Sequence, residues 1–155
     1  MANITIAKKG GTVGTAAGGQ GRFRLQHTID IAKVNAALVA AGSAALASGD
    51  TIVLVDMPVE SGFHIFAVKN NTALVLGTTP TISLGDVASA TRYVNAATAV
   101  TAGTYHTVAT TSFNYPTGGQ VRFAISNAGG TITSGQITTF FEELDFRTLL
   151  PAQVL

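Results

Sequence analysis

Hydrophobic and polar residues alternate along much of the chain. Residues 22–31 read RFRLQHTIDI, in which the apolar residues and His27 fall on one face and the charged and polar residues fall on the other. A strict period of two predicts a β-strand with one buried side.

Further strand-like runs follow from Gly49 onward. They read TIVLVDM, GFHIFAVK, TALVLG, TISLG, TYHTVATTSF, QVRFAIS, TITSG and ITTFFEELDF. Several are separated by NN, GTTP, NYPTGG or NAGG, which carry the residues typical of turns. Short strands joined by turns predict an all-β fold, either an antiparallel β-sandwich or a jelly-roll-like arrangement.

Residues 33–47 are the one segment with a helical composition. They are rich in alanine and leucine, which favour a helix, but Gly42 and Ser43 interrupt the run. We expect one short helix or helical turn there.

Residues 139–149 allow two interpretations. Thr139 and Glu142 have the spacing of a helical capping box. Phe140 and Leu144 instead belong to an alternating apolar pattern, which favours a strand. We expect the strand.

The first 21 residues are expected to form an extended, flexible N-terminal arm. Six glycines fall within residues 10–21, and a coil of this composition spans roughly 20 Å. The short β-like segment NITIAK precedes them. We therefore expect an arm at 1–21, a single β-sandwich domain at 22–148 and a C-terminal tail at 149–155.

Composition excludes several function classes. Hydrophobic residues make up 46% of the chain and charged residues only 11%, which argues against a disordered protein. The net charge is +1 and the nine lysines and arginines are scattered, so no basic stripe for nucleic acid is visible. The lack of cysteine excludes disulfides and thiolate metal sites. We also expect no secretory signal and no membrane span, because no stretch of about 20 apolar residues occurs.

The histidines do not form a metal-binding motif in the sequence. His27, His64 and His106 each lie in a strand-like run, without a second histidine or a carboxylate at metal-ligand spacing. We expect edge or core histidines whose rings have hydrogen-bond partners. Three strands could still bring these residues together in space.

Three carboxylates cluster near the C-terminus, at Glu142, Glu143 and Asp145. On a strand, Glu143 and Asp145 share a face with Thr139 and Phe141, and Glu142 points the other way. A loop of the D-x-D-x-D-G type, which binds calcium, is absent from the sequence. We expect a solvated or interface face rather than a metal site.

Catalytic signatures are also absent from the sequence. The segment GTAAGGQG lacks the lysine of a phosphate-binding loop, and no G-x-S-x-G motif occurs. Tyr93, Tyr105 and Tyr115 could stack on a ligand, but turn or rim positions explain them. We therefore predict no catalytic residue, no cofactor and no metal, and we do not expect an enzyme.

The segment TISLGD, residues 81–86, places a lone carboxylate directly after a strand. We expect Gly85 to supply an unusual φ angle and Asp86 to close an Asx-type turn. Its predicted role is structural.

A longer segment resembles a known group of proteins. It reads SGDTIVLVDMPVESGFHIFAVKNNTALVLGTTPTISLGD, followed by RYVNAAT and later by GGQVRFAISNAGGTITSG. This order of strands and turns resembles small tailed-bacteriophage virion proteins of the capsid decoration (cement) or head-fibre type, over roughly residues 23–126. The glycine-rich arm before residue 22 and the tail FRTLLPAQVL depart from a minimal version of the pattern.

The resemblance implies a β-sandwich that binds the outer surface of an icosahedral phage head. Its partners would be the major capsid protein and further copies of itself, often as a homotrimer, with synthesis in the host cytoplasm. It would stabilise the head by clamping neighbouring capsid subunits, without nucleic acid or membrane.

Both ends of the chain supply candidate contacts with capsid or sister subunits. An arm with alternating apolar residues can add a strand to a partner's sheet edge, and an apolar tail tends to pack on a surface. The candidate contact residues are Ile4, Ile6, Lys8, Lys9, Phe146, Arg147, Leu149, Leu150 and Leu155.

Two other function classes remain open from the sequence. One is a receptor- or glycan-binding module of a phage fibre or tail, which exposed aromatic residues in a cleft would favour. The other is a small hydrolase on a jelly-roll frame, which would need the histidines or the Glu142–Asp145 cluster to converge on a metal.

Overall fold

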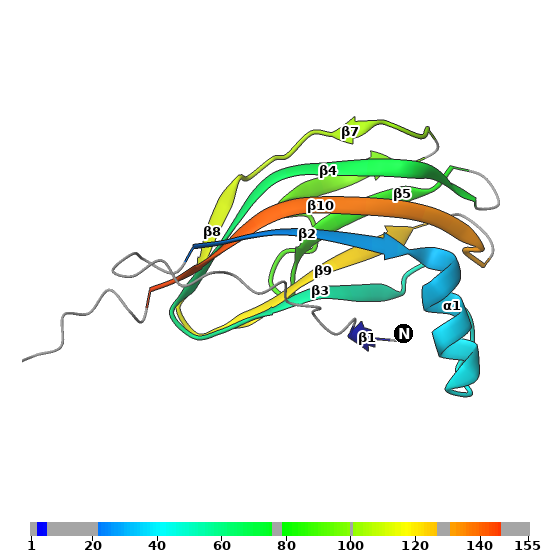
Figure 1. Cartoon of the computed structure of the whole chain (residues 1–155), viewed down its shortest axis with the longest axis horizontal. Helices are drawn as coiled ribbons and strands as arrows, with labels where there is room; N and C mark the ends of the chain where they lie inside the picture. Colours follow the sequence, from blue (N-terminus) through cyan, green and yellow to red (C-terminus); the bar gives the residue numbers. More distant parts are fainter. Residues whose placement is uncertain (1–2, 6–21, 76–78, 100, 127–130, 147–155) are drawn as a thin grey trace, which may run out of the picture.

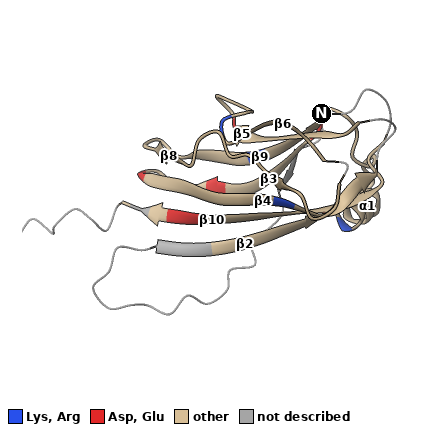
Figure 2. Cartoon of the chain, turned by 90° about the horizontal axis from the view of Figure 1, so that it is seen from above, with Lys and Arg blue, Asp and Glu red and all other residues tan. Residues whose placement is uncertain are grey.

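Two β-sheets face each other in the computed structural model, which describes residues 3–5, 22–75, 79–99, 101–126 and 131–146. In spatial order, the strands of the first sheet are β1 (Asn3–Thr5), β3 (Thr51–Met57), β9 (Gly119–Ser126), β5 (Thr81–Asp86) and β6 (Val94–Thr98). Those of the second are β2 (Arg22–Asp30), β10 (Ser134–Asp145), β4 (Ser61–Val75) and β7 (Tyr105–His106), with β8 (Ser112–Tyr115) also paired to β4. Figures 1 and 2 show the two layers from the side and from above. The predicted all-β sandwich is confirmed.

Strand pairing is antiparallel except at one edge of the first sheet. There β1 runs parallel to β3, with Ile4 in register with Ile52. The arm prediction placed a β-like segment at the N-terminus, and Asn3–Thr5 form it; residues 6–21 lie outside the described part of the chain.

One helix, α1 (Ile31–Ala40), lies at the end of the sandwich opposite β8 (Figure 1). Its N-cap is Asp30, whose carboxylate accepts a hydrogen bond of 3.2 Å from the backbone N–H of Lys33. It ends before Gly42, which has a φ of 76° and so stops the helix where the sequence indicated. The prediction of one short helix in residues 33–47 is confirmed. The observed helix starts two residues earlier and is shorter than that segment. No helix within the described ranges is long and apolar enough to cross a bilayer.

The prediction of a turn at Asn70–Asn71 is wrong, because β4 continues through both residues, with a shift in its register against β10. The Asn70 side chain pairs with His106 Nε2 at 3.0 Å, and Asn71 donates to Thr138 Oγ1 at 2.6 Å. Both amides are therefore satisfied by neighbouring strands, which removes the reason for a turn.

Two other strand predictions also need correction. Within residues 101–115, the structure forms two short strands, β7 and β8, instead of one. The run TITSG is not a separate strand: Thr131 makes an isolated bridge with Ala47, and Ser134 and Gly135 already belong to β10. The expected strand at 139–149 is confirmed as far as Asp145.

The core lies between the two sheets. Phe63 stands near its centre, 4.9 Å from the ring of Phe141 and 5.0 Å from the ring of Tyr93. Its largest fully buried side chains are Tyr93, Phe63, Phe123, Ile29, Ile31, Leu46, Ile52, Ile65, Ile82, Leu84, Ile125 and Ile132.

A bulge in β4 changes which of its residues face the core. Phe140 of β10 pairs with Ala67 and Phe141 pairs with Ile65, so Phe66 is the extra residue of the bulge. Ile65 and Val68 are buried, whereas Phe66 points outward. This bulge builds part of the surface described below.

Candidate functional site

Asp86 is a buried carboxylate with hydrogen-bond partners on both oxygens. It ends β5, and its Oδ1 accepts hydrogen bonds from the backbone N–H groups of Ala88 (3.0 Å) and Ser89 (2.8 Å). These bonds confirm the predicted Asx-type turn. The side chain is 5% exposed, so the turn alone does not account for its charge.

Three further side chains complete the surroundings of Asp86. Arg92 donates to both carboxylate oxygens and lies 3.6 Å from the centroid of the Phe113 ring. Tyr115 donates to Oδ2 at 3.1 Å, and its oxygen lies 2.7 Å from the hydroxyl of Tyr93. Asp86 belongs to the first sheet and Tyr115 to the second, so this Asp86 cluster joins the sheets.

The pKa values in the cluster reflect burial and pairing. Burial raises the pKa of Asp86, but hydrogen bonds from Arg92 and Ser89, the Arg92 charge and the Tyr115 hydroxyl outweigh it, so the net pKa is lowered. Burial raises the pKa of Tyr93 to about 12, and burial together with Tyr93 also raises that of Tyr115. The carboxylate is therefore held charged and the phenols are held neutral, which suits a structural clamp.

Gly85 has a different role from the one predicted. It is not among the described glycines with positive φ. A Cβ atom there would lie 2.1 Å from the carbonyl oxygen of Ser89 and 2.4 Å from the carbonyl carbon of Ala90. The turn needs glycine because its backbone passes this close to the strand.

The prediction of turn or rim positions is wrong for Tyr115, which lies in β8, whereas Tyr93 does lie in the connection between β5 and β6. Tyr93 and Tyr115 are buried in the Asp86 cluster, because their hydroxyl groups find partners there. Tyr105 is exposed, as a rim residue should be.

The histidines lie on three different strands of the second sheet. His106 is buried and bonded to Asn70, and His64 packs edge-on against Phe66 at 4.7 Å. His27 Nδ1 is buried without a hydrogen-bond partner, which contradicts the expectation of a satisfied ring there. Among the described residues, no three histidines or acidic residues group as metal ligands.

The prediction of a solvated carboxylate face is wrong for Glu142 and Glu143. Their exposed fractions are 7% and 8%. β10 lies between β2 and β4, so Glu142 stands between the positions of Arg24 and His64 and is covered by the neighbouring strands. The side chain of Asp145 lies outside the described part.

The predicted contact residues lie at the ends of the chain. Ile4 lies in β1, and its backbone pairs with β3. The remaining arm and tail candidates fall outside the described residues: Ile6, Lys8, Lys9, Arg147, Leu149, Leu150 and Leu155.

Phe146 is the tail candidate that the structure places. Its N–H donates to the carbonyl of Glu60 at 3.0 Å, and its ring lies close to Gly62. Together with Ser61, Asn114 and others it lines a hollow of about 470 Å³ at the β8 end of the sandwich. Phe146 is therefore anchored to the body.

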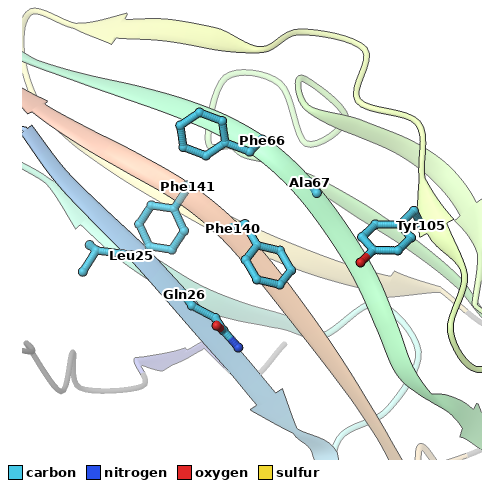
Figure 3. Close-up of a pocket in the computed structure, with 7 residues that line it drawn as sticks. All are labelled: Leu25, Gln26, Phe66, Ala67, Tyr105, Phe140 and Phe141. Atoms are coloured by element: carbon cyan, nitrogen blue, oxygen red, sulfur yellow. The ribbon is translucent and has the colours of Figure 1, made fainter.

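A second hollow, of about 570 Å³, lies over the second sheet. It is lined by Leu25, Gln26, Phe66, Ala67, Tyr105, Phe140 and Phe141 (Figure 3). Sequence reasoning considered Tyr105 as a stacking residue but favoured a turn or rim position for it, and it missed Phe66. In the run FHIF, residues 63–66, alternation places His64 and Phe66 on the same outer face. This pattern could have identified Phe66 as an exposed aromatic residue.

Comparisons with known proteins give a likeness of fold. No family model matches the chain, and no curated protein matches it. A chain of the solved "Cyanophage Pam1 capsid asymmetric unit" is similar, with a TM-score of 0.55 and 20% sequence identity. The likeness covers 86% of this chain and 91% of that chain, so the two share the fold over most of their length.

Proposed function

We propose that this protein is a structural virion protein, specifically a capsid decoration protein. It binds the outer surface of a phage head and clamps neighbouring subunits of the major capsid protein. The observation that carries the proposal is the fold shared with a chain of a phage capsid over 86% of the present chain.

The chemistry of the body supports a structural role. The Asp86 carboxylate, the strongest candidate for an acid–base group, is occupied by an arginine, a tyrosine and two backbone N–H groups. Along the ribbon of the described residues, the lysine and arginine positions lie apart from one another and form no continuous band (Figure 2). On this proposal the protein is not an enzyme, needs no cofactor and binds no nucleic acid.

The N-terminal arm, residues 1–21, is the proposed capsid contact. Residues Asn3–Thr5 pair with the edge of β3, so their backbone is capable of strand addition. The same N–H and C=O groups can pair with the sheet edge of a capsid subunit, since this mode of binding needs no deep pocket. The apolar tail after Phe146 supplies the second contact.

Assembly as a homotrimer would explain how modest contacts suffice. Three copies engage a lattice together, so each additional contact is made at high effective concentration. A ligand that binds the closed shell and not its dissociated subunits stabilises the shell by mass action. After synthesis in the host cytoplasm, the protein would occupy the outer capsid surface.

The test is the heat stability of empty heads assembled from the major capsid protein of the same genome. Added full-length protein should raise the melting temperature of the heads. A variant lacking residues 1–20 should remain folded by circular dichroism but lose most of this effect, whereas Val39→Asp on the exposed face of α1 should keep it. Heads that melt at the same temperature with and without the protein would refute the proposal.

A further inference from the structure

Exposed aromatic side chains gather at one place on this molecule. Of the phenylalanines and tyrosines whose side chains the structure describes, Phe66 and Tyr105 are the exposed ones, at 47% and 61%. Both line the 570 Å³ hollow, which we call the aromatic hollow (Figure 3). Exposed apolar residues that cluster in this way mark binding surfaces, whereas single ones do not.

The hollow is built by the pairing of three strands. Ala67 of β4 pairs with Phe140 of β10, which in turn pairs with Gln26 of β2. The short alanine side chain leaves space between longer neighbours, and the adjoining bulge lets Ala67 follow Phe66 on the outer face while Val68 returns to the core. Tyr105 comes from β7, on the other side of β4. The volume lies within the usual range for ligand sites, roughly 300–1,000 Å³.

The hollow is uncharged, and hydrogen-bonding groups lie beside it. None of its seven lining residues is charged, while the Gln26 amide and the Tyr105 hydroxyl belong to the lining. In the next row along the strands, Thr138 bonds Thr28 at 2.7 Å and Asn71 at 2.6 Å. Lys69 lies 5.2 Å from the centre of the Tyr105 ring and helps to hold that ring in place.

We propose that the aromatic hollow binds a neutral saccharide. Sugar rings carry apolar C–H faces, which pack on the faces of Phe66 and Tyr105, and hydroxyl groups, which bond to the Gln26 amide and the Tyr105 hydroxyl. The seven lining residues carry no charge, so the hollow itself supplies no counter-ion for a carboxylate or sulfate, and Lys69 beside it already contacts the Tyr105 ring. The site is a second binding function and does not depend on the virion role.

The experiment is titration of the full-length protein with defined oligosaccharides, by calorimetry and by saturation-transfer NMR. The neutral probes are maltohexaose, cellohexaose, mannohexaose and hexa-N-acetylchitohexaose, and hexagalacturonate is the anionic comparator. At least one neutral probe should bind, and it should bind more tightly than hexagalacturonate.

Matched variants locate the binding. Tyr105→Ala removes a stacking surface, and Ala67→Leu fills the hollow without removing any contact, so each should weaken binding by roughly tenfold or more. Val39→Ala changes an equally exposed apolar residue on α1 and should leave binding unchanged. Circular dichroism and melting temperature should show all three folded.

Several results would overturn the inference. They are no binding of any neutral probe, tighter binding of hexagalacturonate, or equal affinity in Ala67→Leu and the unmodified protein. A mass by light scattering that falls in Tyr105→Ala or Ala67→Leu would instead identify the face as an interface between copies of this chain. None of these results depends on whether the protein binds heads.

Discussion

The hydroxyl of Tyr115, on β8 of one sheet, donates a 3.1 Å hydrogen bond to the carboxylate of Asp86, on β5 of the other. A phenol has one proton, so the hydroxyl of Tyr93 must be the donor in its 2.7 Å contact with Tyr115. Each hydrogen bond in this series, from Tyr93 to Tyr115 to Asp86, supports the next. The series links the two sheets at the end opposite α1.

Replacing Asp86 by asparagine should destabilise the fold. The amide keeps the shape but removes the charge that pairs with Arg92, which is itself partly exposed, so we expect a loss of about 2–3 kcal/mol. Asp56→Asn is the control, because Asp56 accepts a hydrogen bond from Gln120 at an exposed position and should cost at most about 0.5 kcal/mol. Denaturant unfolding measures the loss of stability in both variants. Equal losses would contradict a stabilising role of the Asp86 cluster.

Stability should fall at alkaline pH. Tyr93 titrates near 10.0 when unfolded and at about 12 when folded, so the unfolded state releases its proton first. The free energy of unfolding should therefore decrease as pH rises from about 10 towards 12, and the raised pKa of Tyr115 adds to the effect. In Tyr93→Phe this decrease should be smaller; an identical pH profile in that variant would rule out the linkage.

Stability should also fall in mild acid. Burial lowers the pKa values of His106 and His27 below 6.5, so the unfolded state binds protons first as pH falls. The stabilising contribution is complete above about pH 6.5 and is lost as pH falls towards the folded-state pKa values. Unfolding curves from pH 7.5 to 5 should show this, with a weaker dependence in His106→Gln. If His106→Gln has the same pH dependence as the unmodified protein, His106 does not contribute to the loss of stability in acid.

Gly85→Ala should be severely destabilising, by about 3 kcal/mol or more, because the new Cβ meets backbone atoms that cannot move independently. Gly42→Ala provides the comparison: its φ of 76° is strained for alanine, but no atom lies within 4 Å, so the expected cost is about 1 kcal/mol. Calorimetric melting should rank them in this order. The reverse order would mean that the turn can open.

The alternation of hydrophobic and polar residues in the sequence predicted the strands whose side chains alternate between the two faces of a sheet, β2, β3, β5 and β9 among them. It failed at Asn70–Asn71, where long-range hydrogen bonds override the local preference of asparagine for turns. It placed Glu143 on the face of Thr139 and Phe141, but could not show that this face is buried in the core between the sheets.

The Asp86 cluster and the aromatic hollow could likewise be predicted only where they depend on residues close together in the sequence. The turn at Asp86 is local, because the N–H groups of Ala88 and Ser89 close it, and an aspartate directly after a strand was enough to predict it. Arg92 lies six residues away and Tyr115 lies 29 away, and only the fold brings them to the carboxylate. The aromatic hollow likewise depends on a bulge in β4, which no local motif announces.

Co-sedimentation with empty heads tests the central claim most directly. The full-length protein is mixed at increasing concentration with heads of the same genome's major capsid protein and is centrifuged through a sucrose cushion. The account predicts that it pellets with the heads and saturates at a fixed ratio to the capsid subunits. Protein that stays in the supernatant at every concentration, while the heads pellet intact, would contradict the claim.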